Sequence, residues 1–264
     1  MSSKSTFTVG IDVGGTFTDL LAIDPATNEV KLAKVPTTVD NQAIGFMAAL
    51  AAAGLDPALL QAVVHGTTTT TNAVLERKIA RAGLITTKGF RDVLELGRRT
   101  RPQAYGLRGT FTPVIDREVR LEVPERMDAD GKVLTALDEA AVADAARRLL
   151  AAGCEAVVIH FLHSYINPVH ERRAAEIVRG LWPNEYVTAG HVILSEYREY
   201  ERGVTAAANA PVQPVLDRYL SRLRTELKAK GFDRDLLVMQ GNGGTISSQL
   251  IAEAAVNTVM SGPA

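Results

Sequence analysis

The chain has 264 residues, of which 46% are hydrophobic and 22% are charged, and its formal net charge is −1. This composition is typical of a globular protein, and the length suits one large α/β domain or two smaller ones. The nearly neutral charge gives no electrostatic reason to expect nucleic acid or an anionic membrane as a partner. The single cysteine, Cys154, excludes an internal disulfide or a cysteine-rich metal site, and its apolar neighbours predict a buried packing role.

The N-terminal residues 1–6 are polar, and they lack the basic segment and apolar core of a secretory signal. No apolar run reaches the ~18 residues that a membrane span needs. We therefore expect a cytoplasmic protein with no membrane partner.

Hydrophobic periodicity predicts strands and helices along most of the chain. The first three strands are expected over 7–13, 19–24 and 30–35. The remaining predicted elements are helices over 41–53, 72–77, 138–152, 168–181, 199–210 and 212–230, the last two separated by Pro211, and strands over 62–65, 82–86, 156–161, 186–193 and 236–239. This order favours a mixed sheet with helices packed on it.

Two segments depart from this pattern. Residues 88–124 lose the periodicity and predict a long excursion from the sheet, such as a lid or a substrate loop. Within it, Arg98, Arg99 and Arg101 are candidates to hold a substrate carboxylate or phosphate, because guanidinium groups bind such anions bidentately. The alternative is a solvated loop. At the other end of the chain, residues 261–263 form a Ser-Gly-Pro turn of the kind that connects two elements, which suggests an interrupted chain.

Residues 10–19, with the sequence GIDVGGTFTD, are the most informative block. They predict two strands joined by a tight turn, in which Gly14 and Gly15 let the backbone approach a ligand closely. The backbone N–H groups and hydroxyls of such a turn suit an anion, and the Asp12 carboxylate at its mouth can hold Mg²⁺ through water. The simpler alternative is an ordinary glycine-rich hairpin. The chain has neither a Walker A sequence nor a Rossmann dinucleotide fingerprint.

Two further clusters have mainly structural interpretations. His160, His163 and His170 are close in sequence, but no acid or cysteine completes a recognisable metal-ligand set. A second cluster is predicted to form charge pairs on a helix surface at i,i+3 and i,i+4 spacing. Its members are Glu196, Arg198, Glu199, Glu201 and Arg202.

Taken together, several segments resemble the hydantoinase A / 5-oxoprolinase family, within the actin, sugar-kinase and Hsp70 ATPase superfamily. The resemblance implies an α/β, ribonuclease H-like mixed sheet flanked by helices, with an inserted or appended α/β subdomain and an incomplete second half. The matching segments are residues 10–19, the His-Gly-Thr-Thr block with its following asparagine at 65–73, and residues 89–93, 197–209, 242–244 and 261–264.

The family resemblance also predicts how the chain is divided. Residues 5–190 would form the N-terminal domain with the phosphate hairpin, and residues 191–264 the truncated start of the main domain. Family members are longer and place a second phosphate turn and an adenosine-binding segment beyond the Ser-Gly-Pro-Ala block. This chain would therefore supply one side of a two-sided nucleotide site, and an inert half-domain is an open alternative.

The resemblance implies an ATP- and Mg²⁺-dependent enzyme that opens cyclic amides such as hydantoins, 5-oxoproline or lactams. Phosphorylation of the ring carbonyl oxygen would make that oxygen a good leaving group. A relative of the ketone-carboxylase type, acting on acetone or acetophenone, is the alternative that these residues leave open. A sugar kinase fits less well, because Phe17, Thr18 and Asp19 replace the lysine or asparagine that usually follows Gly-Gly-Thr there. The implied partner is a hydantoinase B type subunit, in an oligomer.

The resemblance also implies roles for the hairpin residues. Gly14, Gly15 and Thr16 would contact the β- and γ-phosphates, Thr18 would add a hydroxyl, and Asp12 would organise Mg²⁺ through water.

Roles near the reacting group are implied for a second set of residues. His65, Thr67 and Thr68 would flank the transferred phosphoryl group or the substrate oxygen, because histidine exchanges protons near neutral pH. The alternative for His65 is a strand-end side chain satisfied by the backbone. Asn72 would contact substrate or cap the next helix. Asn242, Gly243 and Gly244 would form a backbone nest near the nucleotide, or a plain turn.

Overall fold

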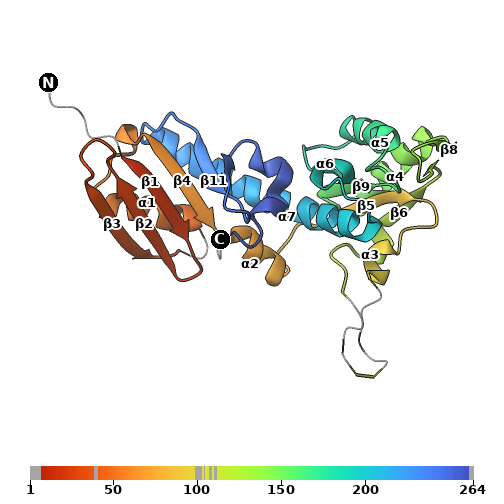
Figure 1. Cartoon of the computed structure of the whole chain (residues 1–264), viewed down its shortest axis with the longest axis horizontal. Coiled ribbons are helices and arrows are strands. Elements are labelled where there is room, and N and C mark those ends of the chain that lie inside the picture. The colour runs from red at the N-terminus through yellow and green to blue at the C-terminus, as the bar shows by residue number, and fades with distance from the viewer. Residues whose placement is uncertain are drawn as a thin grey trace. The chain divides into compact units, whose positions relative to one another are not determined.

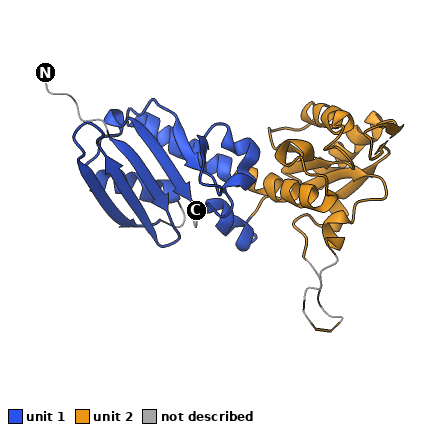
Figure 2. Cartoon of the chain, in the orientation of Figure 1, with its two compact units in different colours: residues 1–78, 215–264 blue, residues 79–214 orange. Residues whose placement is uncertain are grey.

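The computed structural model describes residues 7–38, 41–98, 103, 105–106, 109 and 112–261. The chain divides into two compact units, which are coloured separately in Figure 2. Unit 1 comprises residues 1–78 and 215–264, and unit 2 comprises residues 79–214. Unit 2 is therefore inserted into unit 1. Arg99 and Arg101, two of the predicted substrate ligands, lie outside the described residues.

Unit 1 is built on a six-stranded mixed sheet in the order β12-β11-β4-β1-β2-β3. The predicted hairpin is confirmed, because β1 and β2 pair antiparallel and β3 continues the meander. Strand β4 lies parallel to β1, and β11 lies parallel to β4. The strands are β1 (Thr8–Val13), β2 (Phe17–Ile23), β3 (Val30–Pro36), β4 (Ala62–Thr67), β11 (Leu236–Met239) and β12 (Thr245–Ser247).

One face of this sheet is buried and the other is open. In β1, Val9, Ile11 and Val13 are buried, whereas the alternate residues are exposed, as the two-residue repeat of a strand requires. Helix α1 (Gln42–Ala52) covers the buried face and contributes the fully buried Phe46 (Figure 1). The other elements of this unit are η1 (Pro57–Leu59), α2 (Thr69–Leu75) and η3 (Ile251–Thr258).

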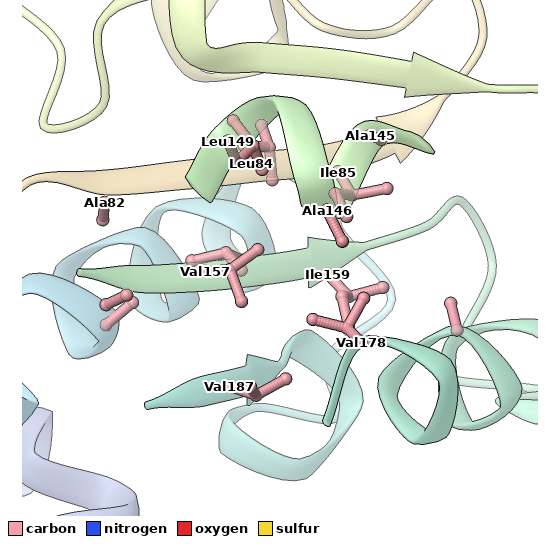
Figure 3. Packing of buried hydrophobic residues seen from close by; sticks show 14 of the residues in the cluster. Ala82, Leu84, Ile85, Ala145, Ala146, Leu149, Val157, Ile159, Val178 and Val187 are labelled. Carbon is pink, nitrogen blue, oxygen red and sulfur yellow. The ribbon is translucent and has the colours of Figure 1, made fainter. Parts of the chain in front are cut away.

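Unit 2 contains a parallel four-stranded sheet in the order β10-β9-β5-β6. Figure 3 shows its core, a cluster of buried residues that includes Leu84 and Ile85 of β5, Val157 and Ile159 of β9 and Leu149 of α4. Cys154 belongs to the same cluster, which confirms its packing role. The elements are β5 (Ala82–Thr87), α3 (Val93–Leu96), η2 (Arg117–Val119), β6 (Arg120–Val123), β7 (Arg126–Met127), β8 (Val133–Thr135), α4 (Glu139–Ala151), β9 (Ala156–His160), α5 (Val169–Arg179), β10 (Val187–Ala189) and α6 (Gly190–Ile193).

Three sequence expectations are wrong in detail. The segment 88–124 is not wholly an excursion, because β6 returns to pair with β5. The strand expected over 186–193 ends at Ala189 and gives way to α6. Helix α7 (Glu199–Ala229) runs through Pro211 without a break. Burial of residues on both sides of that proline, Ala207 and Val212 among them, outweighs the local cost of the missing N–H.

Candidate functional site

The hairpin turn between β1 and β2 leaves backbone donors open. The Gly14 N–H donates to Phe17 O at 3.0 Å and closes the turn. A Cβ at position 14 would lie 3.1 Å from that same oxygen, so only glycine fits without displacement. Within the described part of the chain, the N–H groups of Gly15 and Thr16 have no acceptor, and both residues are exposed. Such a row of unpaired N–H groups is a site for an anion.

Asp12 lies on the open face of the sheet, two residues before this turn. In the strand register it stands opposite Asp19 on one side and opposite Gly66 on the other. Partial burial and the neighbouring Asp19 charge raise the pKa of Asp12 above its usual value. Asp19 itself pairs with Lys34 of β3 at 2.8 Å. Asp12 therefore has a like charge beside it and, in the described chain, no cation of its own.

These groups border a pocket of about 680 Å³ on the open face of unit 1. Ser261 reaches this pocket from the C-terminal segment, where its hydroxyl donates to Thr67 O at 3.0 Å. The same segment is held further by a hydrogen bond from Met260 N to Thr71 Oγ1 at 2.8 Å. The polar residues lining the pocket are Asp12, Asp19, Lys34 and Ser261.

The donor set fits a hydrated Mg²⁺ better than a closed metal site. Among the described residues, no group of three or more histidine, cysteine, aspartate or glutamate side chains could hold a metal ion. Mg²⁺ keeps several waters and binds proteins through one or two carboxylates together with substrate phosphates. Asp12 and Asp19 offer such a pair, and a cation there would offset the burial and the Asp19 charge that together raise the pKa of Asp12.

His65 lies on the opposite, buried face of the sheet. Its side chain is fully buried, its Nδ1 is 3.3 Å from Ile11 O, and its Nε2 is 2.8 Å from the Tyr219 hydroxyl. The Phe46 ring contacts it edge-on with the centroids 5.3 Å apart. Burial lowers the pKa of His65 to about 4, so the imidazole is neutral at physiological pH. In this structure His65 stabilises the interior and does not reach the pocket that contains Asp12.

The three threonines predicted to contact phosphate or substrate lie in different environments. Thr67 and Thr18 are buried, and the Thr18 hydroxyl contacts that of Thr37 at 3.0 Å rather than facing the turn. Thr68 stays close to the turn, because its hydroxyl donates to Val13 O at 3.3 Å. Asn72 in turn donates to Thr68 Oγ1 at 3.3 Å.

The remaining candidates among the described residues lie in two other places. Residues 242–244 form the turn between β11 and β12, where the N–H of Gly243 donates to Gln240 O and that of Gly244 to Asn242 Oδ1. Both N–H groups are therefore already used. Arg98 belongs to unit 2 and pairs with Glu201.

The predicted charge pairs at the start of α7 are only partly on the surface. Arg202 is fully buried, where it donates to Phe161 O and Glu196 O and pairs with Glu199.

Sequence reasoning missed Gly66 and Ser261 as members of the site, although a signal was present. Along a strand, alternate residues share a face, so His65 and Thr67 follow the buried Val63 inward and Gly66 faces outward with Asp12. For Ser261 the sequence offers no such rule, because its position depends on how the last segment folds back onto residues 67–71.

Comparisons with known proteins identify the family of this chain. The sequence model of the hydantoinase/oxoprolinase N-terminal region matches residues 8–181, and that of hydantoinase/oxoprolinase matches residues 202–264. The chain belongs to the hydantoinase/oxoprolinase family. The chain is similar to caprolactamase subunit alpha of Pseudomonas jessenii, 34% identical over 273 residues, and to acetophenone carboxylase gamma subunit of Aromatoleum aromaticum, 34% identical over 278 residues.

Two solved structures confirm the predicted actin-like ATPase fold. The ATP-dependent caprolactamase of Pseudomonas jessenii matches with a TM-score of 0.86 at 32% identity, over 97% of this chain and 38% of that one. Nucleotide-free acetone carboxylase matches with a TM-score of 0.85 at 31% identity, over 98% of this chain and 39% of that one.

The chain spans much less than half the length of these relatives. It covers 39% of the caprolactamase alpha subunit and 37% of the acetophenone carboxylase gamma subunit, although 99% and 97% of this chain takes part in the respective matches. Within the described residues, no helix has the length and apolar character needed to cross a membrane.

Proposed function

We propose that this chain supplies a phosphate- and Mg²⁺-binding half of an ATP-dependent enzyme that opens cyclic amides. The observation that carries the proposal is the position of Asp12 beside Asp19 and Gly66, two residues from a turn with open N–H groups at Gly15 and Thr16. A carboxylate next to free backbone donors is what a Mg²⁺-nucleotide phosphate group requires.

Each group in this site has a separable task. The N–H groups of Gly15 and Thr16 donate to phosphate oxygens, and glycine at position 14 lets the turn close against Phe17 O. Asp12 holds the cation through water, and Lys34 keeps the neighbouring Asp19 charge paired. Mg²⁺, when bound, neutralises charge on the phosphate oxygens.

The low reactivity of cyclic amides explains why an enzyme that opens them would need a nucleotide-binding site. The carbonyl carbon of an amide is a poor electrophile and its oxygen a poor leaving group. Transfer of a phosphoryl group to that oxygen, with cleavage of the bond to the departing ADP, makes later attack by water feasible. Backbone donors and a cation stabilise the charge on the moving group, which is the main contribution of a protein to phosphoryl transfer. The caprolactamase and 5-oxoprolinase relatives are named for such cyclic amides.

ATP-dependent ketone carboxylation is the second candidate, and one observation favours it. Acetone carboxylase matches this chain almost as well as caprolactamase does, with TM-scores of 0.85 and 0.86. Phosphorylation of an enolic oxygen would use the same turn and the same Asp12. The two activities therefore differ in residues beyond those that bind phosphate.

A second subunit is part of the proposal. The caprolactamase, acetophenone carboxylase and acetone carboxylase relatives are each named as one subunit of their enzyme. We propose a partner of the hydantoinase B type in a cytoplasmic oligomer, and the subunit names support a partner subunit.

The first test is calorimetric titration of the 264-residue chain with Mg-ADP. We expect weak binding, because the family resemblance implies a second phosphate turn that this chain does not contain. Asp12→Ala should abolish the binding. Asp233→Ala, which removes an exposed carboxylate elsewhere in unit 1, should leave it unchanged. Equal binding by the wild type and Asp12→Ala would contradict the proposed site.

The second test separates the two chemistries. ADP release by a longer protein that contains this chain should be measured with cyclic amides and, separately, with ketones plus bicarbonate. Stimulation by cyclic amides supports the amide hydrolase. Stimulation by ketones alone would rule it out in favour of the carboxylase.

A further inference from the structure

Unit 1 has a second pocket, on the side of the sheet that faces away from Asp12. Its volume is about 370 Å³, within the range of small-molecule sites. Helices α1, α2 and α7 form its walls. The residues that matter below are Gln42, Asn72, Ala73, Val215, Tyr219 and Arg222.

Three side-chain amides line this pocket, and two of them present donors to it. Asn41 Oδ1 accepts from Ala43 N at 3.2 Å, and Gln42 Oε1 accepts from the Thr69 hydroxyl. Both amide oxygens are therefore used inside the protein, and the two amide NH₂ groups remain as donors at the pocket. The amide of Asn72 is turned the other way, because its NH₂ donates to Thr68 Oγ1 and leaves its oxygen at the pocket. The two free NH₂ groups outnumber that acceptor, which favours an anion.

The charges around the pocket also favour an anion. Glu76 and Lys78 pair at 2.7 Å and cancel each other. Arg222 is exposed, and in the described part of the chain it has no ion-pair or hydrogen-bond partner. Arg218 lines the same wall one helical turn earlier in α7. The net local charge is positive, and guanidinium forks match a planar carboxylate bidentately.

One wall residue of the pocket, Tyr219, is anchored by a hydrogen bond to the protein interior. Tyr219 contributes to the lining, and its hydroxyl is 2.8 Å from His65 Nε2. With His65 Nδ1 assigned as the donor to Ile11 O, Nε2 accepts and the tyrosine hydroxyl donates. Tyr219 is therefore held in place by a buried histidine of β4. This gives His65 a task that its burial permits: it positions the wall of a binding pocket.

The pocket is also connected to the phosphate turn. Asn72, a lining residue, donates to Thr68 Oγ1 at 3.3 Å, and Thr68 donates to Val13 O at 3.3 Å. Val13 directly precedes Gly14. Two hydrogen bonds thus separate a pocket residue from the end of β1.

We propose that this pocket binds a small organic carboxylate. The carboxylate pairs with Arg222 and accepts from the amide of Gln42, and a short apolar body packs against Ala73 and Val215. The inference deepens the proposed function by adding a carboxylate subsite, and it rests on that function for the choice of 5-oxoproline as the probe. The subsite is separate from the nucleotide site, because Asp12 and the hairpin turn lie on the other face of the sheet. It needs no nucleotide and no further part of the enzyme.

The test is calorimetric titration of the 264-residue chain with a matched pair of rings. L-5-oxoproline carries a carboxylate and 2-pyrrolidone is the same lactam without it. We expect 5-oxoproline to bind about tenfold more tightly than 2-pyrrolidone, and Arg222→Gln to weaken its binding about tenfold. Arg147→Gln, which removes an exposed arginine of α4, should have no effect.

Several outcomes would overturn the proposal. Equal binding of the two rings would show that the carboxylate is not recognised, and unchanged binding by Arg222→Gln would place the ligand elsewhere. Failure of both rings to bind would exclude the site. Binding of inorganic phosphate in place of 5-oxoproline, lost in Arg222→Gln, would assign the pocket to a phosphoryl anion instead. Asp12→Ala should leave 5-oxoproline binding unchanged, which separates this result from a failure of the nucleotide site.

Discussion

Asp12 and Gly66 lie directly opposite each other on neighbouring parallel strands, and a Cβ at position 66 would come within 2.9 Å of Asp12 Oδ1. The glycine therefore leaves the space that the carboxylate occupies on the open face of the sheet. Because the clash would fall on the far end of a side chain that can rotate, a larger residue at position 66 would displace the carboxylate rather than break the strand.

Gly66→Ala should weaken Mg-nucleotide binding while leaving the fold intact. We expect binding to fall about tenfold, which corresponds to ~1.4 kcal/mol, because the displaced Asp12 no longer holds the hydrated cation. Calorimetry and circular dichroism measure the two effects. The control is Gly10→Ala on β1, where an added Cβ would meet nothing closer than Leu21 O at 3.9 Å. Full binding by Gly66→Ala would refute the link between this glycine and Asp12.

Asp12→Asn should stabilise the chain at neutral pH while it impairs cation binding. The pKa of Asp12 is raised, so its charged form is less favourable in the folded state than in the unfolded state. Removal of that charge should raise the free energy of unfolding at pH 7 by up to about 0.5 kcal/mol, the usual scale for a solvent-accessible site. Urea denaturation at pH 7 measures this, and a clear loss of stability would contradict the electrostatic reading.

The free energy of unfolding should decrease as the pH falls from 6.5 toward 4. Burial lowers the pKa of both His65 and His160 to about 4. Between pH 6.5 and 4 the unfolded chain therefore binds more protons than the folded chain, which destabilises the fold as acid is added. The loss should be on the order of 2 kcal/mol for each histidine. Urea denaturation across this range measures it, and the double variant His65→Gln/His160→Gln should lose most of the slope. An unchanged slope would show that other groups cause it.

Tyr219→Phe should destabilise the chain by about 1–2 kcal/mol, because it leaves the buried Nε2 of His65 without its hydroxyl partner. Thermal or urea denaturation measures the change. Tyr105→Phe is the matched control, since Tyr105 is 91% exposed and should tolerate the loss of its hydroxyl. Equal stability of the two variants would mean that the Tyr219 hydroxyl does not hold His65.

The local pattern predicted the elements well where neighbours in sequence decide the outcome. The alternation of Val9, Ile11 and Val13 and the glycine pair after them are enough to predict the hairpin, and it is present. The predicted helix break at Pro211 is wrong, because burial of the residues on both sides of the proline stabilises the continuous helix α7. The surface position predicted for Arg202 is wrong for a similar reason: helical spacing cannot show that the carbonyls of Phe161 and Glu196 will accept from its guanidinium.

The same distinction between local and tertiary effects applies to the candidate site. The sequence by itself determined the family, from motifs spread along the chain, and the glycine-rich hairpin with the carboxylate that precedes its turn, because a hairpin depends on neighbouring residues. Only the tertiary structure decided that Asp12 shares its face with Gly66 and Ser261, whereas His65 and Thr67 point into the interior toward Tyr219. The physical reason is that a strand's side chains alternate between two faces, and which face is buried depends on helices that come from distant parts of the chain.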